Sequence, residues 1–243
     1  MERFIGCSGY SYDHWKGIFY PDNLPKYKWL EFYVQHFKTV EINNTFYRMP
    51  DEKTVKAWHS RTPSDFSFAV KGFRFITHMK KLTVDTMSLD SLHQFQQTVT
   101  LLKDKLGPLL WQLPGSFTLN MGKLEKFCSS LSPELNHIFE FRHPTWFVQE
   151  VYDLLHTYHC GLCIISSPGT VPEVVKTTSN VAYIRFHSKG SWYDDNYSNE
   201  DLQAWKDKLD QIQADKLYAY FNNDIGGYAI SNAKYMEGLL GKK

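Results

Sequence analysis

Eight short apolar segments alternate with helical patterns along this chain of 243 residues, and this alternation limits the folds that it can adopt. Apolar residues at every second position predict strands, whereas apolar residues three or four positions apart predict helices. A strand that is followed each time by a helix is typical of a parallel sheet. The predicted strands are 3–9, 39–44, 66–71, 109–114, 137–144, 161–165, 181–187 and 216–221.

The predicted helices complete a repeating pattern that favours a (β/α)8 TIM barrel over a doubly wound sheet, within a single domain over 1–243. Residues 166–180 contain Pro168, Gly169 and Pro172 and have no long amphipathic pattern, so the helix after the sixth strand should be short or missing. Loops after strands are often long and aromatic, which places the expected site at the C-terminal mouth of the barrel. The predicted helices are 29–37, 52–60, 88–105, 119–131, 145–158, 199–213 and 228–240.

Composition limits the binding partners and the cellular location that we expect for the chain. The chain is 42% hydrophobic and its formal net charge is +1, with no run of Lys or Arg longer than two, so nothing in the overall charge calls for nucleic acid or an anionic membrane. The N-terminus has no signal-peptide pattern and no stretch is long and apolar enough to span a membrane, so we expect a cytoplasmic location. The four cysteines are too few for a disulfide framework, and Cys160 and Cys163 should face opposite sides of a strand. The oligomeric state stays open.

Charged residues occur inside the predicted strands, where a barrel normally carries branched apolar side chains. In 137–144, Phe139 and Phe141 share one face while Glu140 and Arg142 share the other. An unpaired buried charge costs several kcal/mol, so these charges need partners or a function. The same alternation assigns to the interior near the mouth Gly6, Ser8, Glu41, Asn43, Lys71, Gln112, Glu140, Arg142, Arg185, His187, Asn222 and Asp224.

Two interpretations fit these charges. The acids Glu41, Glu140 and Asp224 balance three bases, which a purely structural ion network would require, but their expected position at the mouth favours a ligand site. Together with His187 these acids are also metal-ligand types, so a divalent metal is possible, and no other cofactor is predicted. The three bases are Lys71, Arg142 and Arg185. They would repel a metal ion and attract a phosphate or carboxylate, which favours a small anionic substrate.

The predicted catalytic residues are Glu140, Glu41 and His187. Neighbouring cations should keep both glutamates ionised, which suits a base, a nucleophile or an electrostatic role, and His187 would then exchange a proton. Lys71 could form a Schiff base if it were desolvated, but adjacent carboxylates should keep it charged, so we expect it to bind an anion. The predicted substrate-binding residues are Lys71, Arg142, Arg185, Asn43, Gln112, Asn222, Asp224, Gly226, His78, Tyr10 and Trp15.

The chain carries a series of distinctive motifs, which are GCSGY at 6–10, FYP at 19–21, VEINNTFY at 40–47, QLP at 112–114, EFRH at 140–143, RFH at 185–187 and FNND at 221–224, with Trp15, Lys71, His78 and Trp146. In this order the motifs resemble the YecE-like family, domain of unknown function 72, over nearly the whole chain. The resemblance implies a TIM barrel with a polar mouth and no established reaction. Two positions depart from the family pattern: Ser188 stands where a glycine is expected, and Asn44 where a serine is common.

The expected function is an enzyme, a hydrolase, isomerase or lyase, that acts on a small phosphorylated or carboxylated molecule resembling a sugar or a nucleotide. Aromatic loops would form walls for a ring, and Gly226, at a helix start after the last strand, could offer a backbone N–H to phosphate. One alternative is a binding module for nucleic acid or a metabolite, with cations against phosphate and aromatic stacking. Another is a metal-dependent phosphoesterase.

Overall fold

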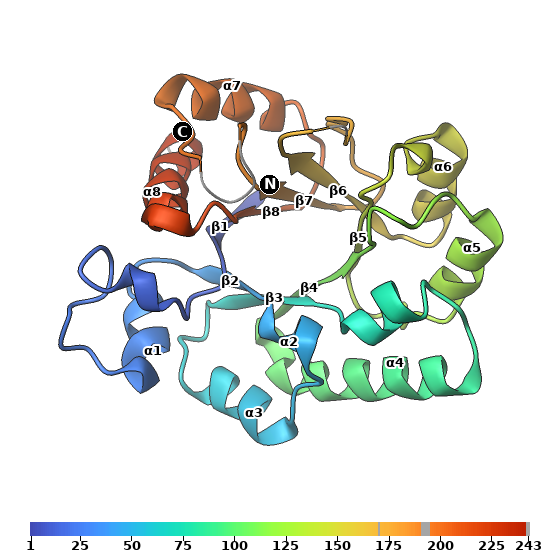
Figure 1. Ribbon diagram of the computed structural model, residues 1–243, viewed down its shortest axis with the longest axis horizontal. Coiled ribbons are helices and arrows are strands. Elements are labelled where there is room, and N and C mark those ends of the chain that lie inside the picture. Colours follow the sequence, from blue (N-terminus) through green and yellow to red (C-terminus); the bar gives the residue numbers. More distant parts are fainter. Residues whose placement is uncertain (170, 191–194, 242–243) are drawn as a thin grey trace.

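The computed structural model describes residues 1–169, 171–190 and 195–241. Eight strands form a closed barrel in which each strand pairs in parallel with its neighbours in sequence, and β8 pairs with β1 (Figure 1). The predicted (β/α)8 fold is therefore confirmed. The strands are β1 (Glu2–Ser8), β2 (Thr39–Ile42), β3 (Ser67–Lys71), β4 (Leu106–Gln112), β5 (His137–Glu140), β6 (Gly161–Ser166), β7 (Val181–Phe186) and β8 (Lys216–Phe221).

Helices surround the barrel, with their buried apolar faces against the strands (Figure 1). Among the described residues between β6 and β7, no helix forms, as predicted for a segment interrupted by proline and glycine. The α-helices are α1 (Trp29–Tyr33), α2 (Asn44–Tyr47), α3 (Glu52–Ser60), α4 (Thr86–Val99), α5 (Met121–Ser129), α6 (Gln149–Thr157), α7 (Asn199–Leu209) and α8 (Tyr228–Gly241). Shorter helical turns are 13–15, 26–28, 75–79, 100–105, 144–146 and 225–227.

The largest differences from the predicted strand boundaries occur in β4 and β5. β4 begins at Leu106, three residues early, and its register with β3 shifts between Phe68 and Val70. Pro108 lies in this irregular stretch, and because proline has no N–H it cannot donate a ladder hydrogen bond. β5 ends at Glu140, so Arg142 follows the strand instead of lying within it.

The predicted helix 88–105 was also too long as one element. It begins two residues earlier, and the regular α-helix ends at Val99. The next turn is a 3-10 helix interrupted at Lys103, whose φ of 52° lies in the left-handed region and cannot continue a right-handed helix.

The barrel interior is apolar below and polar near the mouth. The alternation of strand side chains sends one set inward and the other toward the helices, so Cys163 lies inside the barrel while Cys160 packs outside, as predicted. All four cysteines are buried free thiols. The apolar side chains inside the barrel are Phe4, Ala69, Leu110, Ile138, Cys163, Ile165, Val181, Tyr183, Tyr218 and Tyr220.

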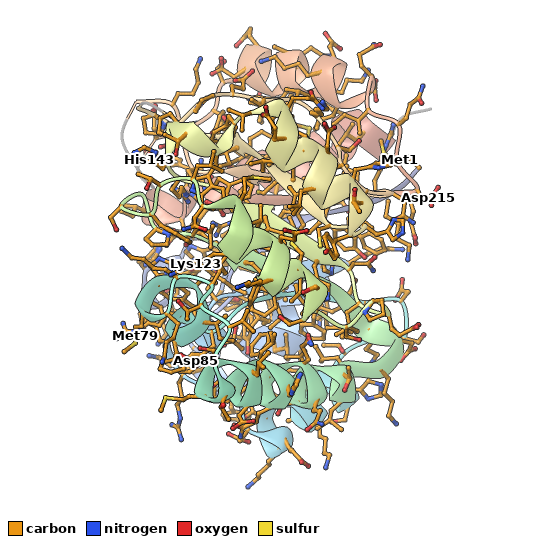
Figure 2. All side chains as sticks on the ribbon, turned by 90° about the vertical axis from the view of Figure 1, so that its right-hand side faces the viewer. Met1, Met79, Asp85, Lys123, His143 and Asp215 are labelled. Atoms are coloured by element: carbon orange, nitrogen blue, oxygen red, sulfur yellow. The ribbon has the colours of Figure 1, made fainter. Side chains whose placement is uncertain are left out.

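The two ends of the barrel have different connections. Met79 and His143, which follow strands, lie at one end, whereas Met1 and Asp215, which precede strands, lie at the other (Figure 2). No helix in the described ranges is both long and apolar enough to cross a membrane. The end that carries Met79 and His143 is the C-terminal mouth.

Gly6 permits a close approach of β1 and β2. A Cβ atom at this position would lie 2.3 Å from the Thr39 carbonyl oxygen, a backbone atom that cannot rotate away. We expect Gly6→Ala to lower the free energy of unfolding by about 3 kcal/mol, because the strands must separate. The control is Gly238→Ala on the exposed surface of α8, where no atom lies within 4 Å; it should raise stability by about 0.5 kcal/mol. Equal urea midpoints for the two variants would contradict this account of Gly6.

Candidate functional site

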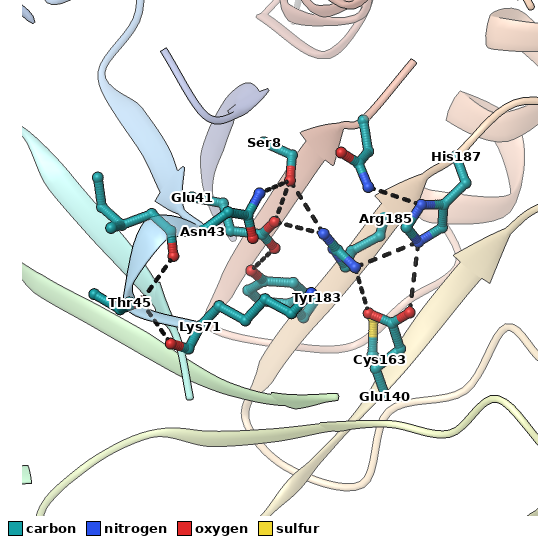
Figure 3. Close-up of polar contacts among 12 residues, drawn as sticks. Ser8, Glu41, Asn43, Thr45, Lys71, Glu140, Cys163, Tyr183, Arg185 and His187 are labelled. Atoms are coloured by element: carbon teal, nitrogen blue, oxygen red, sulfur yellow. Dashed lines mark hydrogen bonds and ion pairs between the residues drawn. The ribbon is translucent and has the colours of Figure 1, made fainter. Parts of the chain in front are cut away.

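A buried chain of ion pairs crosses the barrel just below the mouth. Arg185 on β7 donates from Nη2 to Oε1 of Glu41 on β2 and from Nη1 to Oε2 of Glu140 on β5, both at 2.7 Å (Figure 3). The side chains of both glutamates are 0% exposed and that of Arg185 is 1% exposed. One guanidinium therefore joins strands from three parts of the barrel, as the alternation of strand side chains predicts.

Neutral side chains complete the hydrogen bonding of Glu41. The Tyr183 hydroxyl donates to Oε2 at 2.5 Å, and the Ser8 hydroxyl donates to Oε1. Ser8 in turn accepts a hydrogen bond of 2.6 Å from Nδ2 of Asn43. With Arg185, three donors meet this carboxylate, so its buried charge is compensated.

Glu140 is compensated by two arginines. Arg142 donates from Nε to Oε1, and Arg185 meets the other oxygen. Burial opposes ionisation of Glu140, but Arg142 and Arg185 outweigh it and hold the pKa of this carboxyl well below its usual range. Glu41, Arg185, Glu140 and Arg142 therefore form a charge-balanced network, which is the structural interpretation that the sequence left open for these four residues.

His187 closes the network as a neutral imidazole. Its side chain is fully buried, and burial together with Arg142 and Arg185 holds its pKa well below the usual value. Nη2 of Arg142 lies 2.8 Å from Nε2, and the Asn222 amide lies 2.9 Å from Nδ1. Arg142 therefore contacts both Glu140 and His187, so the imidazole is part of the same network.

Above this network lies a cavity of about 540 Å³. It is built from the ends of β2 and β3 and from the loops after β1, β2 and β8, so it covers one half of the mouth. Five of the predicted substrate-binding residues line it: Tyr10, Asn43, Lys71, Asn222 and Asp224. The complete lining is Gly9, Tyr10, Ser11, Tyr12, Ile42, Asn43, Asn44, Tyr47, Lys71, Asn222 and Asp224.

Lys71 is the cation of this cavity. Its Nζ lies 4.4 Å from the ring centroid of Phe46, and no carboxylate in the described ranges lies within 4.0 Å of it. Burial and the charge of Arg185 lower its pKa to about 7 against the opposing effect of Glu140 and Glu41. The expectation that the carboxylates keep Lys71 fully charged was wrong, because their own arginine partners offset them.

The remaining predicted residues lie elsewhere. Trp15 does not line the cavity: its ring is 0% exposed and packs against Tyr12 and Phe19 within the first loop. Gly226 is exposed in the turn after β8 and outside the cavity lining. Gln112 donates from Nε2 to the neighbouring Leu113 carbonyl at 3.2 Å and does not line the cavity.

His78 and Asp224 also depart from their expected surroundings. His78 packs edge-on against Phe46 at 4.8 Å, and burial with the nearby charge of Lys71 lowers its pKa to about 4. Asp224 does not join the ion network but lies 3.6 Å from Nε2 of His14. It follows β8 in a turn, where the alternation of strand side chains no longer applies.

Several residues at the site were missing from the predicted substrate and catalytic set, among them Ser8, Tyr183, Tyr12 and Tyr47. Ser8 was assigned to the interior without a role, and Tyr183 shares the strand face of Arg185, so both could have been found by the same alternation. Tyr12 and Tyr47 lie in loops and line the cavity. Their aromatic segments were a signal, but no periodicity indicates which loop aromatic residue faces the cavity.

The four predicted metal-ligand types do not form one group, although Glu140 and His187 lie together with 3.5 Å between Oε1 and Nε2. Glu41 and Glu140 face Arg185 from two sides, and Asp224 lies near His14. Within the described ranges, no group of three or more His, Cys, Asp or Glu side chains could hold a metal ion. Use of a divalent metal stays a prediction.

The fold and site define a (β/α)8-barrel protein with a charge-balanced network beneath a polar cavity at its mouth. The chain belongs to the DUF72 family, whose model, described as "Protein of unknown function DUF72", matches residues 4–243. This match confirms the resemblance seen in the sequence motifs.

Individual relatives match this chain over nearly their whole length and nearly the whole length of this chain. The UPF0759 protein YunF of Bacillus subtilis is 27% identical over 268 residues, which span 98% of this chain and 94% of YunF. A DUF72 crystal structure from Thermotoga maritima is 28% identical with a TM-score of 0.88 and covers 100% of both chains. A DUF72 structure from Enterococcus faecalis, 20% identical with a TM-score of 0.86, covers 99% of this chain and 96% of its own and shares the fold.

Removal of the Glu140 charge tests the network. We expect Glu140→Gln to lower the free energy of unfolding by about 3 kcal/mol at pH 7, because two arginines lose a buried counter-charge. The folded pKa of Glu140 is depressed, so its stabilisation is complete above the unfolded value near 4.5 and is lost as the pH falls below it. The difference between wild type and variant in urea unfolding should therefore shrink below about pH 4.5. The exposed control Glu150→Gln should leave the profile unchanged, and parallel profiles for wild type and Glu140→Gln would contradict the assignment.

Proposed function

We propose that the protein is an enzyme that acts on a small phosphorylated or carboxylated substrate in the cavity at the barrel mouth, with Lys71 as the residue that meets the anion. The observation that carries this proposal is the Lys71 amine, which lines the cavity and lies within 4.0 Å of no carboxylate in the described ranges. An ammonium group in such surroundings forms strong charge-assisted hydrogen bonds with an incoming phosphate or carboxylate.

The charge distribution supports an anion over a cation. Glu41 and Glu140 are already neutralised by arginines, so they contribute little negative potential to the cavity. Asp224 is the acid of the cavity lining, and burial raises its pKa above the usual value, which reduces its preference for the charged form. An anion near Lys71 therefore meets one cation and weak opposing charge.

Cavity size and proton chemistry support an enzyme. A volume of about 540 Å³ lies in the range of small-molecule sites. The Lys71 pKa of about 7 allows it to take up or release a proton near neutral pH, as isomerisation and lyase reactions require. Glu41, Glu140 and His187 are fully buried and absent from the lining, so we place them as positioning residues beneath the cavity.

The nucleic-acid alternative has less support. It required three free cations along a phosphate backbone, but Arg142 and Arg185 are engaged with the glutamates, and only Lys71 of the three lines the cavity.

Sulfate is a suitable probe, since its charge does not change near neutral pH. It should bind protonated Lys71, whose pKa in the free protein is about 7, so affinity should be about tenfold weaker at pH 8 than at pH 6. Calorimetric titration measures this change. Lys71→Met should abolish the binding, whereas Lys53→Met on the exposed face of α3 should not. A pH-independent affinity that survives Lys71→Met would contradict the role of Lys71.

Turnover requires a second measurement. Nuclear magnetic resonance of the protein incubated with phosphorylated and carboxylated sugars should reveal conversion of at least one of them. Lys71→Met should slow that conversion at least about a hundredfold, the usual contribution of a group that transfers protons. Absence of conversion, or conversion unaffected by Lys71→Met, would argue against an enzyme of this kind. Oligonucleotide binding at low salt that depends on Lys71 would instead favour the nucleic-acid alternative.

A further inference from the structure

We propose that Lys71 condenses with the carbonyl carbon of an anionic hydroxyaldehyde or hydroxyketone to form an imine, with Asn43 accepting a hydrogen bond from the substrate hydroxyl. This inference rests on the proposed function, because it names the substrate class of the same cavity. It is carried by the juxtaposition of a cavity amine without a carboxylate partner and a buried amide oxygen without a donor.

The backbone sets Lys71 beside Asn43. Ile42 of β2 pairs with Val70 of β3, so the next residues of the two strands, Asn43 and Lys71, are neighbours at the mouth. The Thr45 hydroxyl donates to the Lys71 carbonyl at 2.6 Å and fixes the end of β3 (Figure 3). The amine is therefore presented from a rigid strand end instead of a loop.

The surroundings of the amine suit nucleophilic attack. Its Nζ lies over the face of Phe46, and the Lys71 side chain extends toward Tyr183 and Arg185 (Figure 3). An ammonium held by a carboxylate would have no lone pair to donate. An amine that is desolvated near other cations loses its proton readily, which is how lysine nucleophiles are activated.

Asn43 indicates which substrate group lies next to the reacting carbonyl carbon. Its Nδ2 is committed to Ser8 at 2.6 Å, and its Oδ1 is buried without a hydrogen-bond partner in the described part of the chain. A buried acceptor without a donor is costly, and a hydroxyl group of the substrate would satisfy it. The substrate class is therefore a carbonyl compound with a neighbouring hydroxyl group.

The condensation balances without a further reactant. Lys71 attracts the anionic substrate while it is protonated. Once it has released that proton to solvent, which its pKa of about 7 allows near neutral pH, the neutral amine attacks the carbonyl carbon, the electrons of the C=O π bond move to oxygen, and that oxygen gains a proton. Nitrogen then releases its remaining protons while the hydroxyl group takes one and leaves as water, forming C=N. Asp224 lines the same cavity, and its raised pKa suits a group that donates and recovers this proton.

Reductive trapping tests the imine. Wild-type protein is incubated with glyceraldehyde 3-phosphate or neutral glyceraldehyde and sodium cyanoborohydride, which adds hydride to C=N and leaves a stable secondary amine on the lysine. Peptide mass spectrometry then compares Lys71 with the exposed Lys53. We expect the phosphorylated probe to modify Lys71 at least tenfold faster than Lys53. Sulfate should slow the modification of Lys71.

Variants separate this inference from the proposed function. Lys71→Arg should retain sulfate binding while losing modification at position 71. Asn43→Ala should slow modification of Lys71 by glyceraldehyde but not by propanal, which has no hydroxyl group. If sulfate binds but Lys71 reacts no faster than Lys53, the imine is refuted and the anion site stands. If sulfate fails to bind while neutral glyceraldehyde modifies Lys71 rapidly, the imine stands and the anionic part of the proposed function is refuted.

Discussion

The Arg185 guanidinium between Glu41 and Glu140 is the interaction on which the upper barrel depends. It joins β7 to β2 and β5 through two ion pairs of 2.7 Å, in a region where none of the three side chains has appreciable contact with water. Buried charges of this kind are tolerated only when every member has partners. Ser8, Tyr183 and Arg142 supply further partners, so the strands that contribute them are held in one arrangement. In the described part of the chain, Nε of Arg185 is buried without a hydrogen-bond partner.

This network also determines the chemistry of the cavity above it. Burial lowers the pKa of Lys71 to about 7, and the charges of Glu41 and Glu140, which are paired with arginines, do not reverse this decrease. The same arginines add to that decrease. A buried, charge-balanced layer thus lies beneath Lys71, and removal of any member of the layer would change the electrostatic surroundings of Lys71 without changing Lys71 itself.

The alternation of side chains along strands correctly predicted which side chains on the strands point into the barrel. It placed Glu41, Glu140 and Arg185 inside the barrel at one level, because a regular strand leaves no freedom in which face a side chain occupies. It did not predict the partner of Asp224, which lines the cavity but follows its strand in a turn, where that constraint ends, and lies near His14 outside the ion network. The absence of a donor for Asn43 and the depressed pKa of Lys71 could not be predicted, since both depend on neighbours from distant segments.

The cavity covers only the half of the mouth above β8, β1, β2 and β3. Among the residues that the structure describes, none from the loops after β4, β5 and β6 belongs to its lining, although β5 anchors the network beneath it. These loops can therefore change in length or sequence while the cavity is preserved. Growth of these loops would add walls beside the cavity and lengthen the space available to a ligand without rebuilding the strand end that carries Lys71.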